Sequence, residues 1–178
     1  MKKIIFICVL GILIIGYIIA TPFLTVNNMK NAAEKHDGEE LSEYVDFISL
    51  RQDLKDQMNI LMGKEMLKLA EDNNPFASMG AAFGTMFVDK MVDAYITPTA
   101  ITELMKGAKP NSEDSQNTLE NKDSLEPFKD ASIGYESFSK FSILVTNNET
   151  GDDVRFILRR RGLSWKLTEI KIPLDNPL

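Results

Sequence analysis

The feature that most constrains this chain is an uncharged apolar segment at its N-terminus. Residues 4–20 (IIFICVLGILIIGYIIA) contain no charged side chain. At about 1.5 Å per residue, a helix of this length spans about 25 Å, the lower end of the thickness of a bilayer core. Residues 21–24 can extend the helix. The sequence therefore predicts a transmembrane anchor over residues 1–24.

The distribution of basic residues predicts which way the anchor is oriented. Lys2 and Lys3 precede the apolar segment, and the next basic residue is Lys30. Basic residues concentrate on the cytoplasmic side of a membrane, so the N-terminus is expected there. We therefore expect a single-pass protein of the bacterial inner (cell) membrane, with a periplasmic or otherwise extracytoplasmic domain over residues 25–178.

Two other fates of the N-terminal segment compete with a retained anchor. A cleaved signal peptide needs small residues before the cleavage site, but Ile18 stands at position −3 relative to Ala20, and Pro22 follows closely. Lipid attachment at Cys8 is disfavoured because Cys8 lies within the apolar segment, with no small residue before it. The pattern favours an uncleaved signal-anchor.

Composition narrows the classes of partner. The chain has 20 basic and 26 acidic residues; without Lys2 and Lys3 the basic count is 18, which leaves a net charge of −8 beyond the anchor. Nucleic-acid binding needs a basic face, so no nucleic-acid partner is expected. The expected partners are the lipid bilayer, through residues 4–20, and a protein or a small apolar ligand.

Hydropathy patterns after the anchor predict an α+β domain. Spacings of three and four between apolar residues predict a helical half over residues 27–106. Within it, Gly38 is expected to end one helix, Asp37 to cap the next, and Ser49 to cap a longer one. The expected helices cover 27–35, 39–45, 49–70, 76–95 and 98–105.

A polar linker is predicted over residues 109–126, and after it the apolar period changes from 3.6 to 2. This period predicts a four-stranded antiparallel β-meander over residues 128–173, with its apolar face packed on the helices. In the last strand the parity of apolar positions shifts, which predicts a β-bulge near Thr168 and Glu169.

The sequence offers little catalytic chemistry. His36 is the only histidine and Cys8 the only cysteine, so a His/Cys metal site is excluded by counting. A catalytic base needs an oriented partner, and none is visible beside His36. No catalytic residue, metal ligand or cofactor is predicted, and the balance leans against an enzyme.

Three groups of residues are candidates for other roles. An apolar pocket between sheet and helices is one candidate, and a basic anion or lipid-headgroup patch near the C-terminus is the second. The third is an ion pair that fixes the helix arrangement, because buried charges need partners. The pocket candidates are Phe141, Phe156, Trp165 and Met86; the patch candidates are Arg159, Arg161, Lys166 and Lys171; the ion-pair candidates are Asp46 and Arg51.

The chain resembles the DUF2939 family, bacterial membrane-anchored proteins of unknown function. The segments that carry the resemblance are 20–24 (ATPFL), 44–55 (YVDFISLRQDLK), 92–98 (VDAYITP) and 161–173 (RGLSWKLTEIKIP). The resemblance implies an address and a shape, and it brings no catalytic residues. A looser likeness is to cystatin/NTF2-like domains, in which helices lie on a curved antiparallel sheet, sometimes around a cone-shaped cavity.

Two functions follow as expectations. The first is an uncharacterised membrane-anchored envelope protein that acts as a non-catalytic binding or accessory domain. The second is a small NTF2-like hydrolase or isomerase, which requires ionisable groups that converge in a cavity between sheet and helices.

Overall fold

The computed structural model describes residues 2–71, 77–105, 131–146 and 151–173, and the predicted linker 109–126 lies outside them. Five helices are followed by four strands, which confirms the predicted α+β class. The helices are α1 (Lys2–Glu34), α2 (Gly38–Ser42), α3 (Phe47–Glu71), α4 (Ala77–Tyr95) and α5 (Pro98–Met105). The strands are β1 (Ser132–Ser137), β2 (Lys140–Thr146), β3 (Asp153–Arg161) and β4 (Ser164–Lys171).

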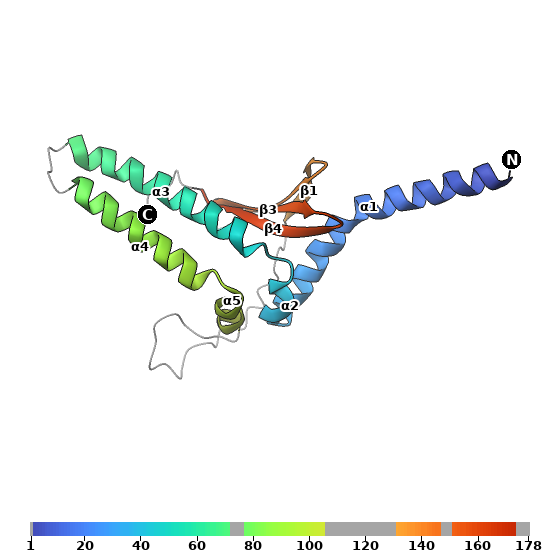
Figure 1. Ribbon diagram of the computed structural model, residues 1–178, viewed down its shortest axis with the longest axis horizontal. Helices are drawn as coiled ribbons and strands as arrows, with labels where there is room; N and C mark the ends of the chain where they lie inside the picture. The colour runs from blue at the N-terminus through green and yellow to red at the C-terminus, as the bar shows by residue number, and fades with distance from the viewer. Residues whose placement is uncertain (1, 72–76, 106–130, 147–150, 174–178) are drawn as a thin grey trace.

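Helix α1 has two halves with different surroundings. Its N-terminal half extends away from the other elements, and its second half turns to run alongside them (Figure 1). The first half is exposed, and α1 is long and apolar enough to cross a membrane. The second half buries Val26, Met29 and Ala32 against the domain. A single helix therefore supplies both the exposed apolar segment and part of the domain core.

Helix α1 contains Pro22, and side chains of the sheet contact the residues just before it. Proline has no N–H group, so it cannot donate to the carbonyl of Ile18 four residues earlier. The Thr21 hydroxyl donates to that carbonyl instead, at 2.7 Å. The Tyr135 hydroxyl of β1 donates to the Ile19 carbonyl at 2.9 Å, and the Trp165 Nε1–H of β4 donates to Thr21 Oγ1 at 3.0 Å. These bonds tie the bend to the sheet.

The four strands form an antiparallel meander in the order β1-β2-β3-β4. In the last pair, Leu158 lies opposite Leu167, while the neighbouring Ile157 lies opposite Glu169. Thr168 is thus the extra residue of a β-bulge, which confirms the predicted bulge. The bulge keeps Leu167 and Ile170 on the same apolar face despite their difference in parity.

The core lies between one face of the sheet, the second half of α1 and the start of α3. Phe23, Tyr135, Phe141 and Trp165 meet in edge-to-face pairs, a preferred arrangement of aromatic rings. The buried members of the cluster are Val26, Met29, Val45, Leu50, Phe141, Ile143, Leu158, Trp165 and Leu167.

The outer edge of β4 is covered by the segment before α3 and by α3 itself. Val45 makes a parallel bridge with Leu167, whose N–H donates to the Tyr44 carbonyl at 2.8 Å and whose carbonyl accepts from Asp46 N–H at 2.9 Å. Farther along the edge, side chains of α3 replace a neighbouring strand. Covering an edge in this way blocks pairing with another chain.

Two side chains of α3, Asp53 and Gln57, bind the backbone of β4 at this edge, and we call this pair the edge clamp. The Asp53 carboxylate accepts from the Ile170 N–H at 3.1 Å and from Gln57 Nε2 at 2.9 Å. Gln57 Nε2 also donates to the Ile170 carbonyl at 2.8 Å, and its Oε1 accepts from Ile172 N–H at 3.2 Å. The Lys171 ammonium pairs with the other oxygen of Asp53. The backbone groups of the β4 edge are therefore satisfied by α3.

Two of the predicted helix caps are wrong and one is confirmed. Asp37 caps α2, because its Oδ1 accepts from the Glu40 N–H at 2.9 Å. Gly38 does not end α1; His36 takes the left-handed backbone conformation, with φ of 56°. Ser49 lies inside α3, whose N-terminus is capped by Asp46 through the Ser49 N–H at 3.1 Å.

Gly38 serves instead as a contact point between α2 and α5, which lie side by side (Figure 1). A Cβ at position 38 would stand 2.8 Å from the backbone nitrogen of Thr102, closer than real Cβ contacts. Gly38→Ala is expected to lower the free energy of unfolding by about 1–3 kcal/mol, because the α5 backbone must shift.

Gly63→Ala is the matched control for this substitution. Gly63 lies within α3, and a Cβ added there meets nothing within 4 Å. Alanine should raise the free energy of unfolding by about 0.5–1 kcal/mol through its helix propensity. Chemical denaturation followed by circular dichroism measures both changes. Equal effects of the two substitutions would refute the proposed close contact at Gly38.

Helix α4 packs on α3, and α3 lies between α4 and the sheet (Figure 1). Gly84 of α4 contacts the side chain of Met62 of α3, so the absence of a side chain at Gly84 allows the two helices to approach closely. Val88 is the buried residue of α4 among those whose side chains are described. The opposite side of α4 is left uncovered by the described residues.

Candidate functional site

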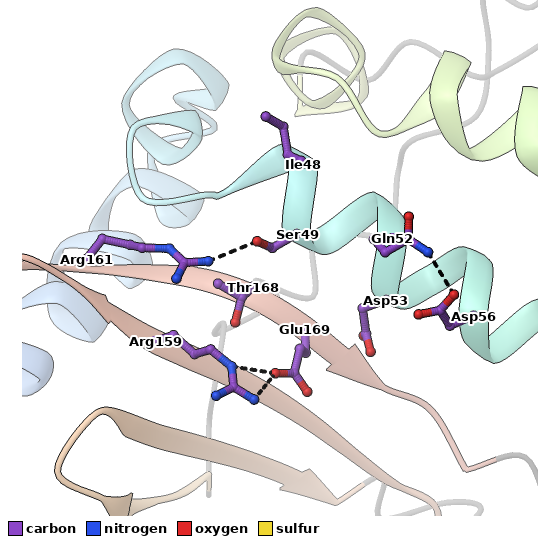
Figure 2. A pocket seen from close by; sticks show the side chains of 9 residues that line it. All are labelled: Ile48, Ser49, Gln52, Asp53, Asp56, Arg159, Arg161, Thr168 and Glu169. Carbon is purple, nitrogen blue, oxygen red and sulfur yellow. Dashed lines mark hydrogen bonds and ion pairs between the residues drawn. The ribbon is translucent and has the colours of Figure 1, made fainter.

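A polar groove of about 450 Å³ lies between α3 and the outer face of β3 and β4 (Figure 2). The outer face is the one opposite the apolar core. The groove exists because α3 runs along the edge of β4, with Leu50 and Leu54 turned to the core and its polar side chains turned outward. The lining residues are Ile48, Ser49, Gln52, Asp53, Asp56, Arg159, Arg161, Thr168 and Glu169.

Arg161 closes one end of the groove. Its Nε and Nη2 lie 3.0 and 2.9 Å from Asp46 Oδ2, and its Nη2 also donates to Ser49 Oγ at 3.0 Å. Burial alone would raise the pKa of Asp46. The Ser49 N–H, the Ser49 hydroxyl and the Arg161 guanidinium outweigh it, so the pKa lies below its ordinary value. Asp46 therefore both caps α3 and ties it to the sheet.

Arg159 and Glu169 form a second pair across β3 and β4. Arg159 Nε and Nη2 lie 2.8 and 2.7 Å from Glu169 Oε1 (Figure 2). The other carboxylate oxygen of Glu169 is 3.3 Å from Lys171 Nζ. Burial alone would raise the pKa of Glu169, but hydrogen bonds from Arg159 and Lys171 and their charges lower it below the ordinary value. Glu169 is ionised at neutral pH.

Because of these pairs, the free energy of unfolding is expected to fall when the pH becomes acid. A carboxylate whose pKa is lowered by folding stabilises the native state above its unfolded pKa, about 4, and loses that contribution as the pH falls through the folded value. We expect the thermal unfolding midpoint to fall on acidification below about pH 4. In Glu169→Gln this fall should be shallower, because the titrating group is absent.

Thermal unfolding followed by circular dichroism between neutral and acid pH checks this expectation. The control is Glu39→Gln, because Glu39 is an exposed residue of α2. A slope for Glu169→Gln that matches both the wild type and this control would show that the Glu169 pairs do not contribute.

The residues of the predicted basic patch lie on the outer face, but each is engaged within the protein. Arg159 and Arg161 line the groove and pair with carboxylates as described. Lys171 pairs with Asp53 and Glu169, and Lys166 donates to the backbone carbonyl of Glu43. The structure thus brings the four cations onto one face, where they bind the protein's own acceptors.

The predicted ion pair of Asp46 with Arg51 is not the pairing found in the structure. Asp46 pairs with Arg161, whereas Arg51 Nε donates to the Phe47 carbonyl at 3.2 Å and lies 4.0 Å from Asp93 Oδ1. Five residues along a helix correspond to a rotation of about 140°, so Asp46 and Arg51 point to different sides of α3. Arg51 faces α4, and Asp46 faces the sheet.

The residues of the predicted apolar pocket are only partly brought together. Phe141 and Trp165 are buried in contact, with ring centroids 6.2 Å apart, and Phe156 packs against the same core cluster. Met86 lies on α4 and is 59% exposed. It is separated from the others because α3 stands between α4 and the sheet. Hydropathy placed Met86 on a buried helix and could not show which side of that helix would be covered.

Among the residues that the structure describes, no group of three or more His, Cys, Asp and Glu side chains is placed to hold a metal ion. His36 lies exposed in the turn between α1 and α2. The expectation that the protein holds no metal and no cofactor stays a prediction.

Two features were missed from the sequence. The first is an apolar stripe on α4, defined by four large exposed side chains: Phe83, Met86, Phe87 and Met91. The spacing of 83, 87 and 91 is a sequence signal for one helix face, but the surrounding apolar residues hide it. The second is Arg160, which lies on the face opposite Arg159 and Arg161 and stacks on aromatic rings. The alternation of side chains along a strand places Arg160 on the face opposite its two neighbours, but it does not predict that Arg160 stacks on Phe138 and Trp165.

Comparison with known proteins gives one match. A family model described as a protein of unknown function (DUF2939) matches residues 12–104. The matched region runs from within the first half of α1 to the end of the helical half, and it includes three of the four segments that carried the resemblance. The fourth, 161–173, lies outside it. No curated protein and no solved structure matches the chain.

Proposed function

This chain belongs to the DUF2939 family of proteins of unknown function, and on that premise we propose that it is a single-pass membrane protein with an extracytoplasmic α+β domain. In this proposal residues 1–24 form the anchor. The domain of residues 25–178 acts without catalysis, as a binding or accessory module of the bacterial cell envelope.

The observation that carries the proposal is the continuity of α1. One helix, Lys2–Glu34, begins with an exposed apolar half and ends inside the domain core. Exposing an apolar surface of that length to water is unfavourable, and inserting it into a bilayer removes this cost. Val26 and Met29 of this same helix are core residues, so no separate linker lies between the bilayer segment and the domain.

Contacts across residues 19–21 favour retention of the anchor over cleavage. A cut after Ala20 would separate the Ile19 carbonyl from the Tyr135 hydroxyl that it binds, and would leave a new charged terminus at Thr21, beside Trp165. A signal peptide that is removed has no reason to be built into the fold in this way.

The ionisable groups of the groove favour a role other than catalysis. Two of its three lining carboxylates, Asp53 and Glu169, are held by Lys171 and Arg159, and the lowered pKa of Glu169 makes it a weak base. General acid–base catalysis is most efficient when the pKa of the catalytic group lies near the operating pH, and the pKa of Glu169 is shifted in the opposite direction. The paired arrangement stabilises the sheet against α3 and supports the binding or accessory role.

The apolar stripe of α4 favours a protein partner. Phe83 and Phe87 are 66% and 65% exposed, and Met86 and Met91 extend the same surface. A contiguous apolar surface on a soluble domain marks a contact with another molecule. Gly84 contacts α3 and Val88 is buried, whereas the four side chains of the stripe are exposed, so a partner could dock on them without disturbing the core.

A topology measurement tests the address. A periplasm-active reporter fused after Leu178 should be active, and a cytosol-active reporter at the same position should be silent. Replacing Lys2 and Lys3 with Glu is the control, because it removes the basic residues on which the orientation depends. Activity of the wild-type fusion in the cytosol alone would overturn the proposed orientation.

A mass measurement tests the partner. Full-length protein extracted in mild detergent should run as a complex larger than one chain with its detergent. The double variant Phe83→Ser with Phe87→Ser should lose that extra mass. The control is Ile60→Ser on α3, at a position that is 57% exposed. If the wild type runs as a single chain, the stripe has no stable partner.

A further inference from the structure

Two β-turns lie at the end of the sheet nearest the bend of α1. The β1–β2 turn carries Phe138, and the β3–β4 turn carries Leu163 next to Gly162, whose φ is 66°. These side chains are 75% and 87% exposed. The two turns are tied together, because the Arg160 N–H donates to the Ser139 carbonyl at 3.0 Å. We call this pair of turns the turn tips.

The turn tips lie at the level where α1 leaves the domain. Tyr135, three residues before Phe138, binds the Ile19 carbonyl, and Trp165, two residues after Leu163, binds Thr21. Two to three residues of strand advance about 7–10 Å, so Phe138 and Leu163 lie about that far beyond these contacts, at the turn end of the sheet. Figure 1 shows the β3–β4 turn directed toward the bend of α1.

Charge at this end of the sheet differs from that of the domain as a whole. Residues 159–166 contain four basic residues and no acidic one, whereas the chain beyond the anchor carries a net charge of −8. Arg159 and Arg161 have carboxylate partners. Arg160 is different: its guanidinium stacks on Phe138 at 4.4 Å and on Trp165 at 4.8 Å. Within the described part of the chain, its buried Nε–H has no hydrogen-bond partner.

We propose that the turn tips dock on the bilayer that α1 spans, with Phe138 and Leu163 inserted among the headgroups and the positive charge of Arg160 attracting the lipid phosphates. This inference rests on the proposed membrane anchoring of α1. Apolar side chains beside basic ones are the composition that binds an anionic bilayer surface. The contact would fix the tilt of the domain on the membrane, because it adds a second attachment beside α1.

Depth-dependent quenching tests the proposal on the full-length protein. In a Cys8→Ser background, an environment-sensitive fluorophore is attached at Leu163→Cys, at Ile60→Cys on α3, or at Ile12→Cys within the anchor. The protein is reconstituted in vesicles of phosphatidylcholine and phosphatidylglycerol. Iodide quenches labels in water, and lipids with a nitroxide at the headgroup quench labels at the surface.

The label at position 163 should be quenched by iodide severalfold less than the label at position 60, and severalfold more by headgroup nitroxides. Arg160→Gln should restore iodide quenching at position 163, whereas Arg160→Lys, which keeps the charge, should not. Equal iodide quenching at 163 and 60, with position 12 shielded, would overturn the docking and leave the anchor intact. Iodide quenching at position 12 would overturn both.

Discussion

Replacing Trp165 with alanine is expected to lower the free energy of unfolding by about 3–5 kcal/mol, a large part of the stability of a domain of this size. Trp165 is 1% exposed, its ring contacts those of Tyr135 and Phe141, and its Nε1–H donates to Thr21 of α1. The substitution opens a cavity and leaves Thr21 without its indole partner. The substitution should weaken both the packing within the sheet and the attachment of α1 to it.

Circular dichroism should follow this denaturation, because Trp165 is the only tryptophan and its removal abolishes the fluorescence signal. Leu163→Ala, two residues away and 87% exposed, is the control and should change stability by less than about 0.5 kcal/mol. Thr21→Val removes the acceptor of the indole together with the bond from the Thr21 hydroxyl to the Ile18 carbonyl, and should cost about 1–3 kcal/mol. A loss for Trp165→Ala no larger than that for Thr21→Val would contradict the central position of the indole ring.

Removing the edge clamp is expected to have the second-largest effect. Asp53→Ala should lower the free energy of unfolding by about 2–4 kcal/mol, since the Ile170 N–H loses its acceptor at a largely buried position and the Lys171 ammonium loses one of its two carboxylate partners. The freed edge of β4 should also favour self-association. Denaturation curves and light scattering of the detergent-extracted protein measure the two effects.

Asp56→Ala is the matched control on the same helix. Asp56 accepts from Gln52, one turn earlier, at 2.8 Å, and its loss should change stability by less than about 0.5 kcal/mol. Asp53→Asn keeps an oxygen for the Ile170 N–H and should give an intermediate loss. If Asp53→Ala and Asp56→Ala behave alike, the side chains of α3 do not hold the edge of β4.

Local signals in the sequence were enough for much of the fold. The alternation of Phe141, Ile143 and Leu158 indicated the apolar face of the sheet, and the shift in parity along β4 located the bulge at Thr168. The start of α5 at Pro98 followed from the preference of proline for the first turn. These features depend on neighbours along the chain, so periodicity is sufficient to find them.

Features that depend on distant partners were harder to predict. Asp46 was paired with Arg51 because a buried charge needs a partner, but its partner in the structure, Arg161, is brought to it by the parallel bridge of Val45 with Leu167. The exposure of Met86 depends on which side of α4 meets α3. Hydropathy reports that a helix is apolar; the tertiary arrangement decides which face is covered.

The intact mass of the mature protein isolated from membranes tests the central claim most directly. If α1 is a retained anchor built into the domain, the protein should resist carbonate extraction and have the mass of the chain that still contains residues 1–24. The account would be contradicted by a lower mass, that of a chain starting near Thr21, together with release of the protein into the soluble fraction.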